Sequence, residues 1–512
     1  MPSSLSGGKK PLKVAVIGAG IGGLTAGALL AHRGCQVTVF EQGAIAGGCA
    51  STFKRRGFTF DVGATQVAGL EPGGIHHRIF SELGIDLPAA TPCDPACAVF
   101  LPGETTPIQV WRNPQKWAAE RQQQFPGSEP FWQLLTTLFR ASWGFQSRDP
   151  ILPAQDPRDW WQLIQAIRPD TLVTVPFTLL TVGDALRLLG LGNERRLRTF
   201  LDLQLKLYSQ VNAEETALLY AATALSLSQE PQGLFHLQGS MQVLSDRLIA
   251  TLERDGGKLY LRSTVEGIVT EHGRVTGVKV RQPSTGKVWT ETADCVIANL
   301  TVQNLAQLLG DASQNPPFKI TSFIHQVEKL PPASGAFIVY LGVDQSAIPA
   351  NCPPHLQFLY NYDGVIGENN SLFVSVSHPG DGRSPAGKAT IIASSFVDVQ
   401  PWWQTADYPS LKQQYTEQAI ARLSEFFHLT PNTIVHQEAA TPRTFARYTA
   451  REQGIVGGIG QRVANFGLFG ISNRTPIQGL WLVGDSTHPG EGTAGVSYSA
   501  LTVVRQIFNN LD

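Results

Sequence analysis

Three glycines near the start of the chain, Gly18, Gly20 and Gly23, have the spacing G-x-G-x-x-G. This spacing is typical of a loop that binds the diphosphate of a dinucleotide. The first glycine makes a tight turn, the second lets the backbone approach the diphosphate, and the third lets a helix pack closely on a strand. The carboxylate of Glu41 can accept hydrogen bonds from a ribose diol and would repel a 2′-phosphate. These residues predict a dinucleotide site, but not one for NADP.

The residues around these glycines predict one βαβ unit. Val14–Ile17 is a β-branched run suited to a buried strand, an Ala/Leu-rich stretch predicts a helix to about Arg33, and Val37–Phe40 is a second apolar strand. The amino terminus of the helix would face the phosphates, because helix amino termini favour anions. The glycines alone could form a turn that binds nothing, but strand, helix and acid together make the motif specific.

A second strand–turn–helix pattern stands near the end of the chain. Leu480–Val483 predicts a strand, Gly484 and Asp485 end it, and a helix is predicted from about Ser497 to Phe508. The turn between them carries two groups that can move protons, His488 and Glu491. Glu491 could instead stabilise the helix dipole.

Composition indicates a large protein with an apolar surface area. With 512 residues the chain is too long for one core, so two or three domains are expected. Charged residues make up 16%, below the roughly 25% of average proteins, and the hydrophobic fraction is 42%. A net charge of −1 gives no reason to expect nucleic acid as a partner.

The cysteines and the amino terminus indicate a protein that is not secreted. The six cysteines are scattered, without a CxxC pair, so we expect reduced thiols and no metal site. The first ten residues lack the apolar core of a signal peptide. No stretch reaches the ~18 apolar residues of a membrane span. The longest candidate, Thr171–Val182, predicts either a buried strand or an interfacial segment.

The middle of the chain predicts helices and then strands. Residues 66–239 are rich in Trp, Phe and Leu at helical spacing, which indicates a helical core or the lining of an apolar tunnel. In residues 306–477 the sequence predicts a sheet followed by the amphipathic helix Pro409–Phe427. The predicted strands of that sheet are Ala336–Leu341, Ser371–Ser377 and Thr390–Phe396.

Four motifs carry a resemblance to a known family. They are AGGCAST from Ala46, GFTFDVGAT from Gly57, HLQGSMQVLSDRL from His236, and GDSTHPGEGTAGVSYSALTVVRQI from Gly484. With these motifs the chain resembles the two-dinucleotide-binding-domain flavoproteins, and within them the carotenoid desaturases and isomerases of the phytoene-desaturase type. It looks most like the cyanobacterial carotenoid C-3′,4′ desaturases. Members usually have an arginine after the G-G pair, where this chain has Cys49.

The resemblance implies an α/β fold of two domains. A Rossmann-like FAD-binding domain would comprise residues 11–65, 240–305 and 478–512. An inserted α+β substrate domain would comprise residues 66–239 and 306–477, with a helical, membrane-associating region at about 157–220.

FAD is the cofactor that the resemblance implies. In the family, a valine like Val265 binds adenine through its backbone, an aspartate like Asp485 bonds the ribitol or diphosphate, and the last helix points its amino terminus at the flavin pyrimidine. The residues implied at the cofactor are Gly18, Ala19, Gly20, Ile21, Gly22, Gly23, Glu41, Gln42, Gly47, Gly48, Cys49, Asp61, Gly63, Ala64, Val265, Gly484, Asp485, Gly495 and Val496.

The implied activity is removal of hydride from a C–C bond next to a conjugated polyene, with a quinone or oxygen reoxidising FAD. The alternatives are a prolycopene isomerase, an amine oxidase, or a non-enzymatic carrier of carotenoid or FAD. An amine oxidase usually has a lysine near the flavin, and the last lysine here is Lys412. The candidate catalytic residues are Glu491, His488 and Arg447, with Arg443 and Tyr448 also near the flavin by family position.

A carotenoid substrate also implies a membrane. Because it is too apolar to diffuse through water, it must be drawn from a bilayer. We expect a peripheral, monotopic protein on the cytoplasmic face of a membrane, the thylakoid or plasma membrane if the chain is cyanobacterial. Thr171–Val182, with Trp160 and Trp161 nearby, is predicted to lie in the membrane interface at the tunnel mouth.

Overall fold

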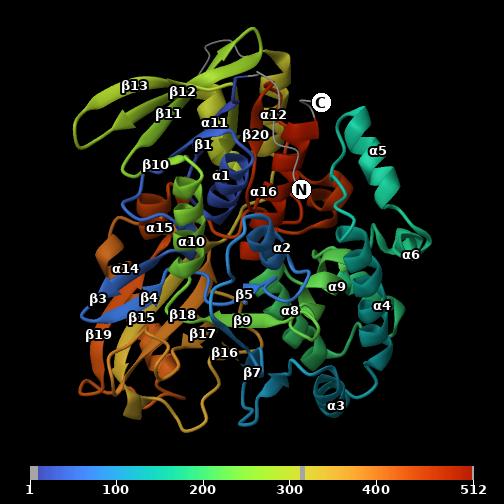
Figure 1. Cartoon of the computed structure of the whole chain (residues 1–512). Helices are drawn as coiled ribbons and strands as arrows, with labels where there is room; N and C mark the ends of the chain where they lie inside the picture. The colour runs from blue at the N-terminus through green and yellow to red at the C-terminus, as the bar shows by residue number, and fades with distance from the viewer. Residues whose placement is uncertain (1–9, 312–316, 510–512) are drawn as a thin grey trace.

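The computed structural model describes residues 10–311 and 317–509 (Figure 1). Five parallel strands form one sheet in the order β10-β2-β1-β14-β20. Each of the three segments predicted to form the FAD-binding domain contributes to it. The strands are β1 (Lys13–Ile17), β2 (Gln36–Phe40), β10 (Lys258–Tyr260), β14 (Cys295–Ala298) and β20 (Leu480–Leu482).

Both faces of this parallel sheet are buried. On β1, Val14 and Val16 pack on one face against α1 (Ile21–His32), α10 (Gln242–Arg254) and α16 (Thr493–Asn509). Ala15 and Ile17 pack on the other face, against the antiparallel sheet β11-β12-β13 and α11. This explains why the predicted strands are continuous apolar runs. The elements of the second face are β11 (Thr264–Glu271), β12 (Arg274–Gln282), β13 (Lys287–Thr292), α11 (Val302–Asp311) and α12 (Phe318–Glu328).

A second sheet of seven strands has the order β19-β15-β18-β17-β16-β7-β8. It joins residues 97–110 to residues 335–440, so both parts of the predicted substrate domain share one sheet. Its strands are β7 (Cys97–Phe100), β8 (Ile108–Val110), β15 (Gly335–Asp344), β16 (His355–Leu359), β17 (Ser371–Val376), β18 (Lys388–Val397) and β19 (Ile434–Ala440). Helix α14 (Tyr408–Leu423) covers one face of it.

Several helices between residues 114 and 226, among them α3, α4, α8 and α9, lie together at the lower right of Figure 1. Their leucines and aromatics pack with β7 and β8 in one core. The helices are α3 (Pro114–Gln124), α4 (Glu129–Gln146), α7 (Val182–Leu188), α8 (Arg195–Ser209) and α9 (Leu218–Ser226).

Smaller elements connect the two sheets. The hairpin β3-β4 follows the glycine pair, and β5, β9 and β6 form a three-stranded sheet. The bounds are β3 (Thr52–Arg55), β4 (Phe58–Asp61), β5 (Val67–Ala68), α2 (Ile75–Glu82), β6 (Ala90–Pro92), β9 (Leu234–Leu237), α13 (Gln400–Gln404) and α15 (Pro442–Thr449).

The segment after α4 differs from the rest of the molecule because its apolar side chains are exposed. It contains α5 (Pro157–Ala166), α6 (Pro169–Leu172) and the 3₁₀ turn Val175–Phe177. The prediction of a buried strand at Thr171–Val182 is therefore wrong. Among the described residues, no helix is both long and apolar enough to span a bilayer.

Candidate active site

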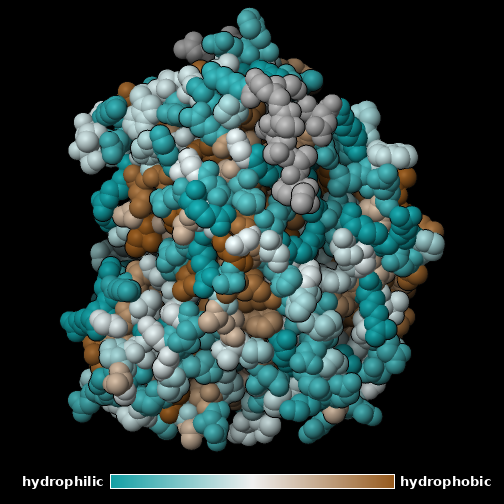
Figure 2. All heavy atoms as spheres, in the orientation of Figure 1, coloured by the Kyte–Doolittle hydropathy of each residue, from teal (hydrophilic) through white to brown (hydrophobic). Residues whose placement is uncertain are grey.

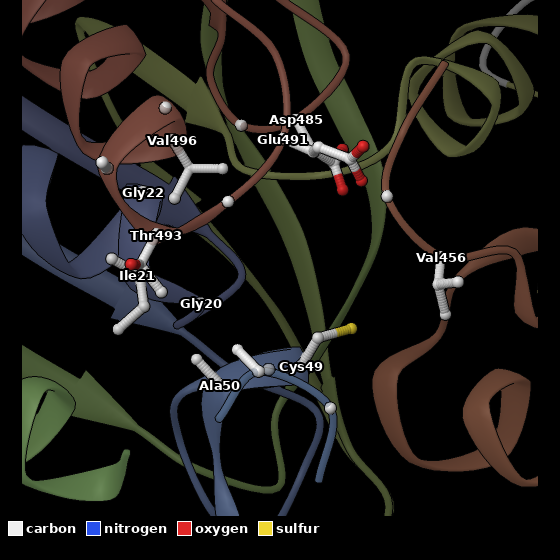
Figure 3. Close-up of a pocket in the computed structure, with 18 of the residues that line it drawn as sticks. Gly20, Ile21, Gly22, Cys49, Ala50, Val456, Asp485, Glu491, Thr493 and Val496 are labelled. Atoms are coloured by element: carbon white, nitrogen blue, oxygen red, sulfur yellow. The ribbon is translucent and has the colours of Figure 1, made fainter. Parts of the chain in front are cut away.

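One cavity of about 900 Å³ is lined by residues of both sheets. Ile17 and Phe40 line it from the five-stranded sheet, and Ile338 and Phe373 line it from the seven-stranded sheet. Figure 3 shows a part of its wall. The cavity therefore connects the predicted dinucleotide loop with the predicted substrate domain.

The G-x-G-x-x-G loop forms the tight turn that its spacing predicts. Gly18 has φ +90° and donates its N–H to the carbonyl oxygen of Phe40 at 2.8 Å. A Cβ on Gly23 would lie only 2.1 Å from the carbonyl oxygen of Gly18, so the third glycine lets α1 pack on the turn. The first turn of α1 lines the cavity at Ile21 and Gly22.

Glu41 lies at the end of β2, as predicted, and lines the cavity. Its two carboxylate oxygens accept backbone N–H bonds, one from Ala19 at 2.8 Å and one from Gly43 at 2.7 Å. Burial raises the pKa of Glu41, while these two N–H donors oppose the shift. The acid thus holds the dinucleotide loop against β2 as well as facing the cavity.

The glycine pair after β2 lies beside the first loop. Gly47 has φ +116° and donates its N–H to the carbonyl oxygen of Ala19 at 2.8 Å. The thiol of Cys49 points into the cavity (Figure 3), and burial raises its pKa. Gly63 and Ala64 line the same wall.

Asp61 does not line the cavity, which corrects its prediction as a cofactor residue. Its side chain is 2% exposed and forms a salt bridge with Arg383 at 3.0 Å. It also accepts the backbone N–H of Met241 at 2.8 Å. Arg383 in turn donates to the carbonyl oxygen of Leu237 at 2.8 Å. Asp61 therefore joins the β3-β4 hairpin to the residues around β9.

The C-terminal turn completes the nucleotide end of the cavity. Helix α16 begins at Thr493, four residues before the predicted start, so that Gly495 and Val496 lie in its first turn. Gly484 has φ +120°, and Asp485 forms a salt bridge of 2.6 Å with Arg451. The amino termini of α1 and α16 therefore both face the cavity.

Most of the predicted cofactor residues are brought together in this cavity. Those that line it are Gly18, Gly20, Ile21, Gly22, Glu41, Gln42, Gly47, Gly48, Cys49, Gly63, Ala64, Val265, Gly484, Asp485, Gly495 and Val496. Ala19 and Gly23 support the loop from behind without lining the cavity.

Glu491, predicted as catalytic, lines the cavity beside Asp485 (Figure 3). One oxygen, Oε2, accepts a hydrogen bond of 2.9 Å from the amide of Gln210. The other, Oε1, has no hydrogen-bond partner among the described residues. Burial raises the pKa of Glu491 well above its ordinary value, and the neighbouring Asp485 adds to the shift. The surroundings of this side chain therefore favour its protonated form.

His488 also lines the cavity and is 7% exposed. Its Nε2 lies 2.7 Å from the side-chain nitrogen of Gln146. Because an amide nitrogen can only donate, Nε2 is the acceptor, which requires a neutral imidazole. Burial lowers the pKa of His488 to about 4, consistent with that form.

The predicted arginines lie outside the cavity wall. Arg447 is exposed, and its guanidinium lies over the ring of Tyr448, so its prediction as catalytic is corrected. Arg443 donates to the carbonyl oxygen of Trp402 at 2.7 Å. Tyr448 lines the cavity but is 63% exposed. Arg443 and Arg447, one helical turn apart on α15, both lie on a face of this helix that does not line the cavity.

Comparison of the sequence with models of protein families shows to which family the chain belongs. The model described as flavin containing amine oxidoreductase matches residues 21–508, nearly the whole chain. The chain belongs to this family.

The curated relatives of this chain include enzymes named for carotenoids. The prolycopene isomerase of Daucus carota is 26% identical, over 97% of this chain and 80% of the relative. The zeta-carotene-forming phytoene desaturase of Myxococcus xanthus is 25% identical, over 97% of this chain and 93% of the relative. The resemblance to carotenoid desaturases and isomerases is confirmed, while the narrower likeness to C-3′,4′ desaturases stays a prediction.

Solved structures show the same fold. An oxidoreductase from Methanosarcina mazei matches with a TM-score of 0.64 at 18% identity, over 96% of this chain and 100% of the other. Putrescine oxidase bound to putrescine matches with a TM-score of 0.62 at 15% identity, over 98% and 99%. The predicted α/β fold is confirmed by these matches.

The nucleotide end of the cavity fits a flavin nucleotide. Two helix amino termini face the cavity, which suits the anionic diphosphate and the negative charge of a reduced flavin. A Cβ on Gly18 would lie 2.7 Å from the carbonyl oxygen of Asn299, so the wall is built from close-packed main chain. Among the described residues, no group of three or more His, Cys, Asp or Glu side chains could hold a metal ion.

The other end of the cavity is mainly apolar. It lies between α8 and α9 on one side and the sheet face opposite α14 on the other. Its lining residues include Leu203, Leu207, Tyr208, Tyr220, Ala224, Leu227, Ala336, Ile338, Ile366 and Phe373. The leucines and aromatics that could have been ordinary core thus line a cavity, as a tunnel requires.

Three polar residues of the cavity were not predicted from the sequence. Arg451, Lys206 and Gln210 all line the cavity. Lys206 donates through Nζ to the carbonyl oxygen of Gln210 at 2.9 Å and to the hydroxyl of Ser334 at 3.0 Å. The absence of lysines after Lys412 is therefore a weak argument against an amine oxidase, because Lys206 of α8 lines the cavity. No local motif marks these residues.

Proposed function

We propose that this protein binds FAD and removes hydride from a C–C bond next to the conjugated polyene of a carotenoid, as in C-3′,4′ desaturation. The observation that carries the proposal is the continuous cavity, which has a main-chain nucleotide site at one end and an apolar extension at the other. The names of the curated relatives that match 95–98% of the chain supply the substrate class.

FAD, when bound, supplies the acceptor for the hydride. The amino termini of α1 and α16 would hold the diphosphate and the pyrimidine end of the flavin. Side chains of α8, α9 and the seven-stranded sheet would orient the polyene and exclude water, so that one C–C bond lies at the flavin. Glu491 would hold or release the proton at Oε1, the oxygen that no described residue contacts.

A cis–trans isomerase is the second candidate. Prolycopene isomerases are among the relatives, at 25–27% identity. The raised pKa of Glu491 also favours it, since a carboxylic acid can protonate a polyene, whereas accepting a proton requires a carboxylate. The two reactions should depend on pH in opposite ways, because one needs Glu491 protonated and the other needs it ionised. The pKa of Glu491, which burial raises, sets the pH at which both change. An isomerase that uses the acid loses activity as pH rises through the pKa of Glu491, and a desaturase that uses the base gains it.

The decisive experiment incubates the purified protein with candidate carotenes and either oxidised or reduced FAD. A red shift of the polyene absorption with oxidised FAD indicates new double bonds. A changed cis band without lengthening, with reduced FAD, indicates isomerisation. Bound pigment without conversion under either condition would contradict both reactions and leave a carrier.

The exposed apolar segment supports a membrane-bound mode of action. We define the 160–179 patch as Trp160, Trp161, Ile164, Ile167, Leu172, Val173, Val175 and Leu179, whose side chains are 41–65% exposed. Hydrophobic atoms appear along the right margin of Figure 2, where Figure 1 places α5 and α6. An apolar patch of this kind marks an interaction surface. We propose that it inserts into the cytoplasmic face of a membrane.

The position of the patch relative to the cavity agrees with that role. Arg148, next to the cavity residue Ser147, pairs with Asp170 of α6 at 3.0 Å. On α5, the buried Asp159 pairs with Arg474 at 2.8 Å and keeps the two tryptophans facing outward. A carotenoid, and a quinone as electron acceptor, could then reach the cavity from the bilayer; oxygen is the alternative acceptor.

Liposome flotation tests the membrane proposal. Replacing Leu172 and Leu179 with aspartate should reduce flotation at least ~10-fold, because each charge opposes burial in the interface. Aspartate at Val288 and Tyr260, apolar side chains that are 41% exposed elsewhere, is the matched control and should leave flotation unchanged. Equal flotation of all three proteins would exclude the patch.

A further inference from the structure

A pair of glycines lies directly behind the acids of the cavity. Gly457 and Gly458 both have φ +71°. A Cβ on Gly457 would lie 2.2 Å from Nε2 of Gln210 and 2.2 Å from Oε2 of Glu491. A Cβ on Gly458 would lie 2.5 Å from the carbonyl oxygen of Asp485. The glycine-rich stretch Gly454–Gly460 therefore leaves the space in which the Gln210–Glu491 hydrogen bond forms.

The conformation of Gln210 is unusual. It ends α8 with φ +69°, in the left-handed region, which costs a residue other than glycine about 1 kcal/mol. The ammonium of Lys206, one turn earlier, donates to the carbonyl oxygen of Gln210 and supports this turn. Burial lowers the pKa of Lys206. The half-buried Lys206 and a left-handed turn thus combine to direct one amide toward Glu491.

The hydrogen bond from Gln210 is the one that Glu491 receives within the described residues. The charged and titratable groups that act on the acid through space are Asp485, Arg451, Lys206 and Tyr220. Asp485 is already paired with Arg451 at 2.6 Å. Both the orientation of the Glu491 carboxyl group and the donor at Oε2 therefore depend on a helix of the substrate domain.

We propose that Gln210 is the positioning residue of Glu491: its amide fixes Oε2, leaves Oε1 as the oxygen that exchanges the proton, and couples that proton to the placement of α8. The inference rests on the proposed function, in which Glu491 handles the proton. Because Tyr208, two residues before Gln210, lines the cavity, a substrate packed on α8 would contact the helix that holds the acid.

Infrared difference spectra of the FAD-loaded protein between two pH values test this directly. The carboxyl C=O band that disappears in Glu491→Gln identifies Glu491 without any assay of activity. In Gln210→Leu, a near-isosteric change, we expect this band at higher frequency and its pH midpoint about one unit higher, because the amide no longer stabilises the carboxylate. The limb of the pH–rate profile that Glu491 sets, acidic for a desaturase and basic for an isomerase, should move in the same direction.

Gln506→Leu is the matched control, because Gln506 donates to a carboxylate elsewhere, that of Asp159, at 3.0 Å. It should leave the Glu491 band unchanged. If Gln210→Leu does not fold, Gln210→Glu keeps the shape, and two adjacent carboxyls should again raise the midpoint. An unmoved band and midpoint in a folded Gln210 variant would overturn the proposal. Failure of the proposed function would look different, since the band would respond as expected while no carotene is converted.

Discussion

The two ends of the cavity are built in different ways. At the nucleotide end, consecutive residues supply the wall as main chain, in the loops that begin at Gly18, Gly47 and Gly484. Where the substrate end begins, side chains from distant segments meet, as Gln210 at the end of α8 and Glu491 of the C-terminal turn do across 281 residues. The comparison teaches that a main-chain site tolerates little substitution but is recognisable locally, whereas a side-chain site can change its chemistry while the fold persists.

The largest expected effect tests the main-chain end. Gly23→Val places a side chain where even a Cβ would be 2.1 Å from the carbonyl oxygen of Gly18. We expect loss of bound flavin and a free energy of unfolding lower by about 3 kcal/mol. Flavin absorbance and thermal unfolding measure both. Gly34→Ala is the control, since φ is +87° but no atom lies within 4 Å, and it should retain flavin.

At the side-chain end, Glu491→Gln should spare the cofactor. We expect turnover at least ~100-fold lower, the size of a lost proton-transfer step, with flavin content unchanged. Steady-state turnover of the preferred carotene and the visible flavin spectrum provide the two readings. Glu452→Gln, at an exposed glutamate, serves as control. Loss of flavin from Glu491→Gln would break the contrast between the two ends.

A variant that breaks the salt bridge between Asp61 and Arg383 should lower the stability of the fold without weakening cofactor binding. Arg383→Gln leaves Asp61 buried without its cation and should lower the free energy of unfolding by about 3 kcal/mol. Because neither side chain lines the cavity, the affinity of the folded protein for FAD should not change. Denaturant unfolding and FAD titration check the two parts. Weaker FAD binding would return Asp61 to the cofactor site.

The smallest effect is expected at His488. His488→Asn removes the acceptor for Gln146 and should lower turnover by less than about fivefold, or ~1 kcal/mol. With its pKa lowered to about 4, the imidazole stays neutral from pH 5 to 8, so removing it should not change the pH–rate profile in that range. A pH limb lost in this variant would show that His488, rather than Glu491, handles the proton.

The sequence by itself determined the nucleotide end of this protein. The turn at Gly18, the close packing at Gly23 and the acid at the end of β2 are properties of consecutive residues, so their spacing was sufficient. Motif spacing also placed Glu491 and His488 in the turn before the last helix, which the structure locates at the cavity.

Tertiary structure alone decided which side chains complete the site. Arg447 and Asp61 matched their motifs, yet one lies on the surface and the other in a buried salt bridge, because helix rotation and partner choice depend on contacts far along the chain. Lys206, Gln210 and Arg451 carry no motif and reach the cavity through packing of α8 and the loop after α15. The exposure of the 160–179 patch was likewise decided by the tertiary structure, in which Asp159 anchors α5 to Arg474, since an apolar sequence is equally suited to a core.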